Sequence, residues 1–227
     1  MEWDALLTAE DRLVIERGGY GQPKGLGRRP ALLLIDIQKI YLGADAPLAE
    51  SLGDWASGGG QQAWEAVRRL PPLVEAFRQR ELPVIYTRQG IPEGAEAFDN
   101  FVAKTKRDVS RYRRGHPDQA ICDLVRPAPQ DIVIDKAYAS VFYGTPVETY
   151  LTGLGVDTLV IAGGSTSGCV WAAATDAVAR GYKVALVRDA CYDRIKVSHA
   201  ATLLNFWMKF GDLLTVTEAI AYAERDA

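Results

Sequence analysis

The chain has 227 residues, of which 48% are hydrophobic and 24% charged, and its formal net charge at pH 7 is −3. This length suits one large domain with a substantial core, and the composition is that of an ordinary globular protein. The weak negative charge gives no general attraction to nucleic acid or to an anionic membrane, so neither is expected as a partner. The sequence has no apolar run near the roughly 18 residues of a membrane span, and its acidic start does not resemble a signal peptide.

The cysteine content indicates the redox environment. The sequence has three cysteines, Cys122, Cys169 and Cys191. An odd and sparse set of this kind does not form a disulfide framework, on which many small secreted proteins depend for their stability. We therefore expect a reduced, cytoplasmic protein.

Residues 1–29 are expected to form an arm ahead of the main domain, which then covers residues 30–227. Asp4 to Arg17 can form a short helix, whereas the glycines and the proline of residues 18–27 prevent its continuation. An arm in this position often packs on a neighbouring subunit, and a loosely held terminus is the alternative. The arm therefore favours a homo-oligomer.

Apolar runs bounded by turn residues alternate with helical patterns along the rest of the chain. The strands are predicted at residues 30–36, 82–87, 131–136, 158–162, 183–188 and 213–216. The helices are predicted at residues 61–80, 146–153, 170–180, 196–210 and from 217 onward, with a break or kink at Pro71–Pro72. This alternation predicts an α/β fold with a doubly wound, mainly parallel six-stranded sheet and helices on both faces.

Two segments between these elements have a less regular pattern. Residues 38–60 are rich in glycine, and irregular segments of this length are usually functional or mobile. Residues 88–130 carry a basic cluster close to His116, formed by Lys104, Lys106, Arg107, Arg111, Arg113 and Arg114. Such a run is usually a solvated face or a subunit rim, and attraction of an anionic substrate is the alternative.

Cys169 is predicted to lie where the strand at 158–162 gives way to the helix at 170–180. The small residues Gly163 to Gly168 between them allow a sharp turn and the close approach of a ligand. Free backbone N–H groups and the helix dipole stabilise a thiolate at such a place, so we expect a lowered thiol pKa. A small buried cysteine that closes a tight turn is the alternative interpretation.

Asp36, Lys136 and Cys169 each follow a predicted parallel strand. The carboxyl ends of such strands meet at one crevice of a doubly wound sheet, so we expect these three side chains to converge. Asp36 can exchange the thiol proton, and Lys136 can hold Asp36 and favour the thiolate. The N–H groups of Gly168 and Cys169 can form an oxyanion hole. A helix cap at Asp36 or a buried structural ion pair is the alternative.

Three motifs stand in order along the chain. They are Ala31–Asp36, Asp135–Lys136 with Ser140–Thr145, and Gly163–Val170. Together they resemble the isochorismatase-like cysteine hydrolases, and the resemblance covers nearly all of residues 28–220. The form of Ser165–Val170, with Gly27–Ala31 before the first strand, is most similar to the branch of N-carbamoylsarcosine amidase and maleamate amidase.

The resemblance implies a three-layer α/β/α fold and a catalytic triad of Asp36, Lys136 and Cys169. It implies hydrolysis of a small linear amide or N-carbamoyl compound through a thioester, with release of ammonia and without a cofactor. A cis peptide bond is implied at Gly164–Ser165, in an oxyanion loop formed by Gly164, Ser165, Thr166 and Gly168. Members of this branch assemble as dimers or tetramers, which the resemblance extends to this chain.

Differences from other branches bear on the reaction and on a metal. Isochorismate-cleaving relatives lack the nucleophilic cysteine, so the presence of Cys169 argues against that reaction. The nicotinamidase branch builds a metal site from an Asp and His residues near the first member of the triad. Neither His116 nor His199 is placed in that way, so no metal is implied.

Arg194, Trp171 and Phe142 are predicted to bind the substrate. Trp171 stands where the amidase branch often has an arginine, which leaves the substrate open. Arg194 resembles a carboxylate-holding arginine of that branch, and a salt bridge at a helix start is the alternative. Without a carboxylate partner for Arg194, a neutral ureide or biuret-like substrate fits better.

A function of another class is also compatible with the glycine-rich turn. Gly163 to Gly168 could cradle a phosphate, as in a flavodoxin-like protein that binds a nucleotide or a flavin. A scaffold that keeps the fold without activity is a further alternative. The combination of Asp36, Lys136 and Cys169 favours the hydrolase over both.

Overall fold

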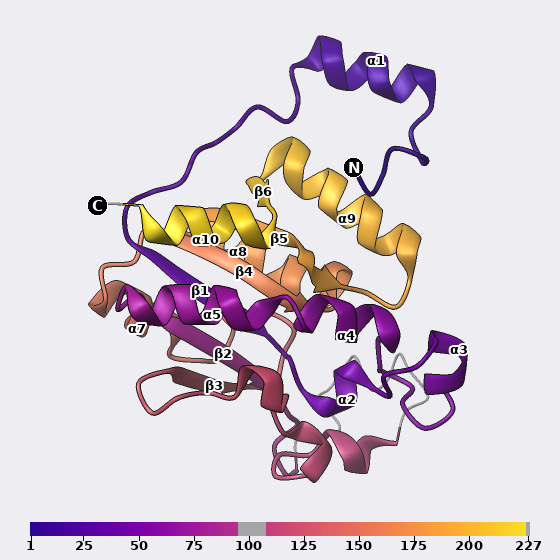
Figure 1. The fold of residues 1–227 in the computed structure, drawn as a ribbon, viewed down its shortest axis with the longest axis vertical. Coiled ribbons are helices and arrows are strands. Elements are labelled where there is room, and N and C mark those ends of the chain that lie inside the picture. The colour runs from indigo at the N-terminus through magenta and orange to yellow at the C-terminus, as the bar shows by residue number, and fades with distance from the viewer. Residues whose placement is uncertain (95–107, 226–227) are drawn as a thin grey trace.

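The computed structural model describes residues 1–94 and 108–225. Six strands form one sheet, and every strand pairing that the structure describes is parallel (Figure 1). In their order across the sheet, the strands are β3 (Ile132–Lys136), β2 (Val84–Gln89), β1 (Pro30–Ile35), β4 (Thr158–Gly164), β5 (Lys183–Tyr192) and β6 (Asp212–Leu214). The predicted six-stranded parallel sheet is confirmed.

Helices pack on both faces of this sheet, so the fold has three layers. One face carries α4 (Gln61–Val67), α5 (Leu70–Gln79) and α10 (Val216–Glu224), and the other carries α7 (Val147–Gly153), α8 (Trp171–Ala179) and α9 (Lys196–Lys209). Leu32 and Leu34 of β1 pack with the first group, whereas Leu33 and Ile35 pack with the second, because successive side chains of a strand point to opposite faces. Burial of both faces explains the unbroken apolar run of β1.

In the described residues, the segments from β1 to α4 and from β2 to β3 form short helical turns. They are α2 (Lys39–Leu42), α3 (Leu48–Ser51) and the 3₁₀ turns Val109–Tyr112, Pro117–Gln119 and Asp123–Val125. An isolated bridge between Gln38 and Ile121 ties the two segments together just beyond the end of β1. None of the helices in residues 1–94 and 108–225 combines the length and the apolarity of a membrane span.

Two helix starts differ from the prediction. The break before α5 lies ahead of Pro71–Pro72, because Arg69 is the N-cap and the two prolines occupy the first turn of α5. Proline is tolerated there, since the first N–H groups of a helix have no partner within it. The last helix begins after Thr215 rather than at Thr217, because Thr215 and Glu218 form a capping box.

β5 continues beyond its predicted end at Arg188 and reaches Tyr192. The register between β4 and β5 shifts after Ile161, and Gly164 then lies opposite Tyr192. A Cβ atom at position 164 would lie 2.4 Å from the Tyr192 ring, so this close packing requires glycine. The extension carries the chain directly to Asp193, at the edge of the sheet where the predicted site lies.

The N-terminal arm first packs on the domain and then leaves it. Trp3 is buried, and its ring centroid lies 5.4 Å from that of Trp207 in α9. The following helix, α1 (Ala9–Gly18), buries no residue and stands apart from the sheet (Figure 1). It begins later than predicted because Thr8 caps it in a capping box with Asp11.

Candidate active site

A cavity of about 280 Å³ opens at the carboxyl ends of the central strands. Asp36 follows β1, Gln89 ends β2 and Cys169 follows β4, and all three line this cavity. Lys136, the last residue of β3, lies behind it and is buried against Asp36. The parallel topology therefore brings Asp36, Lys136 and Cys169 to one place.

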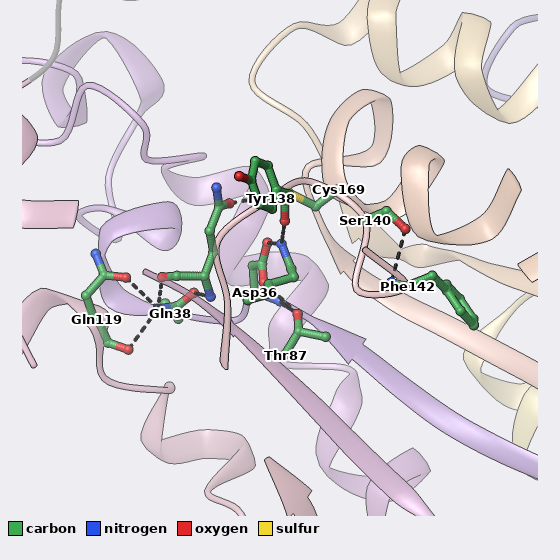
Figure 2. A network of polar contacts seen from close by, with 10 residues as sticks. Asp36, Gln38, Thr87, Gln119, Tyr138, Ser140, Phe142 and Cys169 are labelled. Atoms are coloured by element: carbon green, nitrogen blue, oxygen red, sulfur yellow. Dashed lines mark hydrogen bonds and ion pairs between the residues drawn. The ribbon is translucent and has the colours of Figure 1, made fainter. Parts of the chain in front are cut away.

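Asp36 and Lys136 form a buried ion pair. Lys136 Nζ donates hydrogen bonds to Asp36 Oδ2 at 2.8 Å and to the Tyr138 carbonyl at 3.1 Å. Thr87 Oγ1 donates to the other carboxylate oxygen, Asp36 Oδ1, at 2.5 Å (Figure 2). Burial alone would lower the pKa of Lys136, but the neighbouring Asp36 carboxylate and Cys169 sulfur raise it above its ordinary value. The lysine is therefore held in its charged form.

The backbone of Asp36 adopts a left-handed conformation with φ of 48°. Residues other than glycine rarely adopt it, because it costs on the order of 1 kcal/mol or more. Two hydrogen bonds hold the chain there: the Asp36 N–H donates to Thr87 Oγ1 at 3.0 Å, and the Gln38 N–H donates to the Asp36 carbonyl at 2.8 Å. The chain is thus fixed where it leaves β1 and passes the cavity.

Cys169 lies in a π-helical turn, Thr166–Val170, which precedes α8. The peptide bond Gly164–Ser165 just before this turn is cis, which confirms the expectation drawn from the family resemblance. Asp193 holds the turn from the side of β5, since its Oδ2 accepts hydrogen bonds from the Ser167 N–H at 2.8 Å and from the Ser167 hydroxyl at 2.7 Å. The position of the sulfur therefore depends on both β4 and β5.

The predicted oxyanion loop differs in part from the prediction. Gly164, Ser165 and Gly168 line the cavity, but Thr166 does not: it is buried, and its Oγ1 lies 2.8 Å from His199 Nδ1. The Gly168 N–H donates to the Ser165 carbonyl at 3.0 Å, so it is engaged within the turn. Its prediction as a free oxyanion donor is corrected, because this bond to the residue three positions earlier uses that N–H.

The expected lowering of the Cys169 pKa is wrong. Burial raises the pKa of the thiol to about 12; the Lys136 ammonium opposes this shift and the Asp36 carboxylate adds to it. The sequence pattern identified the N–H groups and the helix dipole, but not the enclosure of the sulfur by the surrounding protein. At rest the sulfur is therefore protonated, and it requires a base to become a nucleophile.

Three cavity residues with polar side chains, Tyr41, Gln89 and Tyr138, were not predicted from the sequence. Tyr41 belongs to α2, inside a segment predicted only as irregular, and Tyr138 lies in the turn after β3. Gln89 pairs in register with Lys136, at the end of a strand predicted to stop two residues earlier, at Thr87. Because parallel strands end at one edge of the sheet, the full length of β2 brings Gln89 to the cavity together with Asp36 and Lys136.

Arg194 also lines the cavity, and its Nη1 donates to the Ser57 carbonyl at 2.5 Å. A guanidinium has five N–H donors, so further donors remain for a ligand. Within the described residues Arg194 forms no ion pair, so the alternative of a salt bridge at a helix start is not supported.

Trp171 and Phe142 were predicted to bind substrate, but neither lines the cavity. The Phe142 side chain is buried in the core beside α7, and Figure 2 shows it pointing away from Asp36 and Cys169. Trp171 packs edge-on against Phe210, the C-cap residue of α9, with ring centroids 5.2 Å apart. Both predictions are corrected, because nearness to a motif along the chain does not determine the direction of a side chain.

The predicted basic cluster lies partly outside the described residues, which exclude Lys104, Lys106 and Arg107. Of its other members, Arg111 forms an ion pair with Asp118, with 2.7 Å between Nε and Oδ2. This pair links the 3₁₀ turns Val109–Tyr112 and Pro117–Gln119. Within the part of the chain that the structure describes, no group of three or more His, Cys, Asp or Glu side chains is arranged to hold a metal ion.

Comparison with known proteins places this geometry in a family. Residues 30–218 match the isochorismatase domain. The chain belongs to the isochorismatase family. The relationship predicted from the three motifs is confirmed, and so is the prediction that the chain is a hydrolase.

Two named relatives are similar over nearly the whole chain. Maleamate amidohydrolase of Pseudomonas putida is 36% identical over 207 residues, which cover 90% of this chain and 91% of the relative. N-carbamoylsarcosine amidase of an Arthrobacter species is 27% identical over 216 residues, covering 91% and 75%. The crystal structure of a cysteine hydrolase from Pseudomonas syringae pv. phaseolicola has the same fold, with a TM-score of 0.76 at 23% identity, covering 89% of this chain and 99% of that one.

Proposed function

We propose that this protein is a cysteine-dependent amidohydrolase of a small linear amide or an N-carbamoyl compound. The observation that carries the proposal is that Cys169 shares a cavity with Asp36, which is held by the buried Lys136. The similarity to maleamate amidohydrolase and N-carbamoylsarcosine amidase supports this class of substrate. We assign the catalytic roles to Asp36, Lys136 and Cys169.

The first half of the proposed reaction forms a thioester. Asp36 accepts the thiol proton while the sulfur of Cys169 bonds to the amide carbonyl carbon, and the carbonyl π pair moves to oxygen. Because burial makes this thiol a weak acid, the proton transfer accompanies the attack rather than preceding it. Asp36 then gives the proton to the nitrogen, the C–N bond breaks, and a primary amide releases ammonia.

The second half returns the thiol. Water attacks the thioester carbonyl while Asp36 accepts one of its protons, and the C–S bond breaks as the acid product forms. Asp36 then returns this proton to the sulfur of Cys169. Lys136 remains charged throughout and keeps the carboxylate oriented, since its Nζ is bonded to Asp36 Oδ2. One carboxylate thus exchanges protons in both halves.

Arg194 is assigned to a carboxylate on the substrate. Its guanidinium lies at the cavity, and an arginine can pair with a carboxylate through two parallel N–H bonds. Maleamate and N-carbamoylsarcosine both carry such a carboxylate besides the reacting carbonyl. We therefore place acidic amides ahead of neutral ureides such as biuret.

The proposal is tested by ammonia release from maleamate, N-carbamoylsarcosine, biuret and acetamide, with the wild type beside Cys169→Ala and Cys191→Ala. We expect turnover of at least one acidic amide, loss of all turnover in Cys169→Ala and retention in Cys191→Ala, which removes a buried thiol outside the cavity. Mass spectrometry of the wild type, quenched with acid during turnover, should detect the acyl adduct on Cys169. Ammonia release by Cys169→Ala at the wild-type rate would overturn the mechanism.

A further inference from the structure

Gln89 touches the reacting sulfur, yet the mechanism above does not use it. The Cys169 thiol donates a hydrogen bond to Gln89 Oε1, with a sulfur–oxygen distance of 3.4 Å. The Gln89 side chain lines the cavity and is only 9% exposed. Its amide oxygen is therefore an acceptor beside the point where the substrate carbonyl has to arrive.

The position of Gln89 is fixed by a second glutamine. Gln38 Oε1 accepts from the Gln89 N–H at 2.8 Å, and Gln38 Nε2 donates to the Gln89 carbonyl at 3.0 Å. Gln38 is itself buried, and its Nε2 also bonds to Gln119 Oε1 at 2.7 Å (Figure 2). The Gln38 side chain thus bonds to the backbone of Gln89 as a neighbouring strand would, and it holds the end of β2 in place. A buried network of this kind is costly unless its members are satisfied, and it specifies one geometry.

We propose that Gln89 Oε1 accepts a hydrogen bond from the N–H of the substrate's reacting amide group, and so selects amides over the corresponding esters. This inference rests on the proposed amidohydrolase function. The nitrogen is bonded to the carbon that the sulfur attacks, so it arrives beside the sulfur, where Oε1 already lies. An ester presents an oxygen at the same place, which has no hydrogen to donate and faces the lone pairs of Oε1.

The same contact couples substrate binding to the movement of the thiol proton. At rest the S–H group of Cys169 points to Gln89 Oε1. When a substrate N–H occupies that acceptor, the S–H turns to Asp36, which takes the proton as the S–C bond forms. Asp36 then passes this proton to the nitrogen as the C–N bond breaks. An ester leaves the S–H group on Gln89, because it does not compete for Oε1.

The test compares maleamate with its ester analogue, monomethyl maleate, in the wild type, Gln89→Met and Gln89→Glu. Release of maleate is followed by chromatography for both substrates, and folding is checked by circular dichroism and thermal melting. Methionine keeps the length of the side chain but removes the acceptor. Glutamate keeps the acceptor and adds a charge, which opposes thiolate formation with either substrate. The decisive quantity is the ratio of kcat/KM for the amide to kcat/KM for the ester.

We expect the ratio to fall about tenfold or more in Gln89→Met, because a buried N–H is left without a partner. In Gln89→Glu the ratio should stay near that of the wild type, although both rates fall. An unchanged ratio in Gln89→Met, or an equal fall of the ratio in both variants, overturns the role of Gln89 while the amidohydrolase proposal stands. If the wild type releases maleate from neither compound, the proposed hydrolysis of maleamate is wrong. The proposed selection of amides by Gln89 is then overturned as well.

Discussion

Lys136 Nζ lies 2.8 Å from Asp36 Oδ2, although the two residues are 100 positions apart and the strands that carry them are not neighbours. β2 lies between β1 and β3, and Lys136 reaches past it to Asp36 in a site closed to solvent. Removing two charges from water costs several kcal/mol for each ion, and their attraction repays this only in good geometry. The pair is therefore better explained by what it does to Cys169 than by a gain in stability.

Lys136→Met is expected to lower the free energy of unfolding by about 3–5 kcal/mol and to abolish turnover. The reason is that Asp36 stays buried without its counter-ion. Urea denaturation and ammonia release measure the two effects. Arg88→Met is the matched control, because it removes the cation of a more exposed pair with Asp135 at 2.6 Å, worth about 1 kcal/mol or less. Equal losses of stability in both variants would contradict the account.

Alkylation of Cys169 by iodoacetamide should speed up about tenfold per pH unit from pH 7 to pH 10, without a plateau. The raised pKa of about 12 leaves a small thiolate fraction that grows over this whole range. Mass spectrometry locates the label and separates Cys169 from the buried Cys122 and Cys191. A plateau below pH 9 would show that the thiol pKa is lowered after all.

Stability should fall in acid through His199. Burial lowers the pKa of His199, against the opposing charges of Asp193 and Glu2, so below about pH 6.5 the unfolded chain binds a proton that the folded chain does not. The stabilisation that comes from the lowered pKa of His199 is thus present at neutral pH and lost as the pH falls. Urea midpoints from pH 4.5 to pH 7.5 should show a weaker dependence in His199→Asn. An unchanged pH dependence in His199→Asn would contradict this account.

Arg194→Lys should reduce kcat/KM for an acidic amide more than for its neutral analogue. Lysine keeps the charge but loses the planar fork, and a misplacement of about 1 Å can lower a rate roughly a hundredfold. Maleamate and acetamide, or another amide pair that the wild type hydrolyses, provide the comparison. Arg69→Lys serves as the control, since its guanidinium donates to the Asp189 carbonyl outside this cavity. An equal loss of kcat/KM on both substrates would mean that Arg194 has only a structural role, through its bond to the Ser57 carbonyl.

The arm should take part in a homo-oligomer. Leu13 and Val14 of α1 are exposed, whereas Trp207 of α9 is covered by Trp3 of its own chain. Leu13→Glu/Val14→Glu is expected to lower the mass measured by light scattering at micromolar concentration. Leu124→Glu, at an equally exposed leucine outside α1, should leave the mass unchanged. A monomeric wild type would contradict the prediction.

The sheet and the meeting of Asp36, Lys136 and Cys169 could be predicted because they follow from topology. Apolar runs buried on both faces specify parallel strands, and parallel strands place their ends together. Gln89 was missed only because its strand was predicted two residues too short. The arrangement of the strands and the residues at their ends could therefore be predicted from the order of the elements along the chain.

Properties that depend on packing around the site could not be predicted. The thiol pKa depends on how closely the surrounding protein covers the sulfur, which the local motif does not specify. Phe142 and Trp171 are large apolar side chains near motifs, and either could have faced the cavity or the core. The extension of β5 to Tyr192 depends on its register shift against β4. Each of these outcomes is decided by distant parts of the chain.

The strand order divides the sheet into one half made of β1, β2 and β3, which are synthesised first, and another made of β4, β5 and β6. Asp36 and Lys136 belong to the half of the sheet that is made first, and Cys169 and Arg194 belong to the half that is made later. One edge of β1 stays unpaired until β4 leaves the ribosome, which at about 5–20 residues per second takes several seconds. An unpaired apolar edge is a template for aggregation. The yield of soluble protein during expression should therefore depend on what shields residues 30–35 in the nascent chain. Slower initiation of translation or a co-produced chaperone is the direct way to raise this yield.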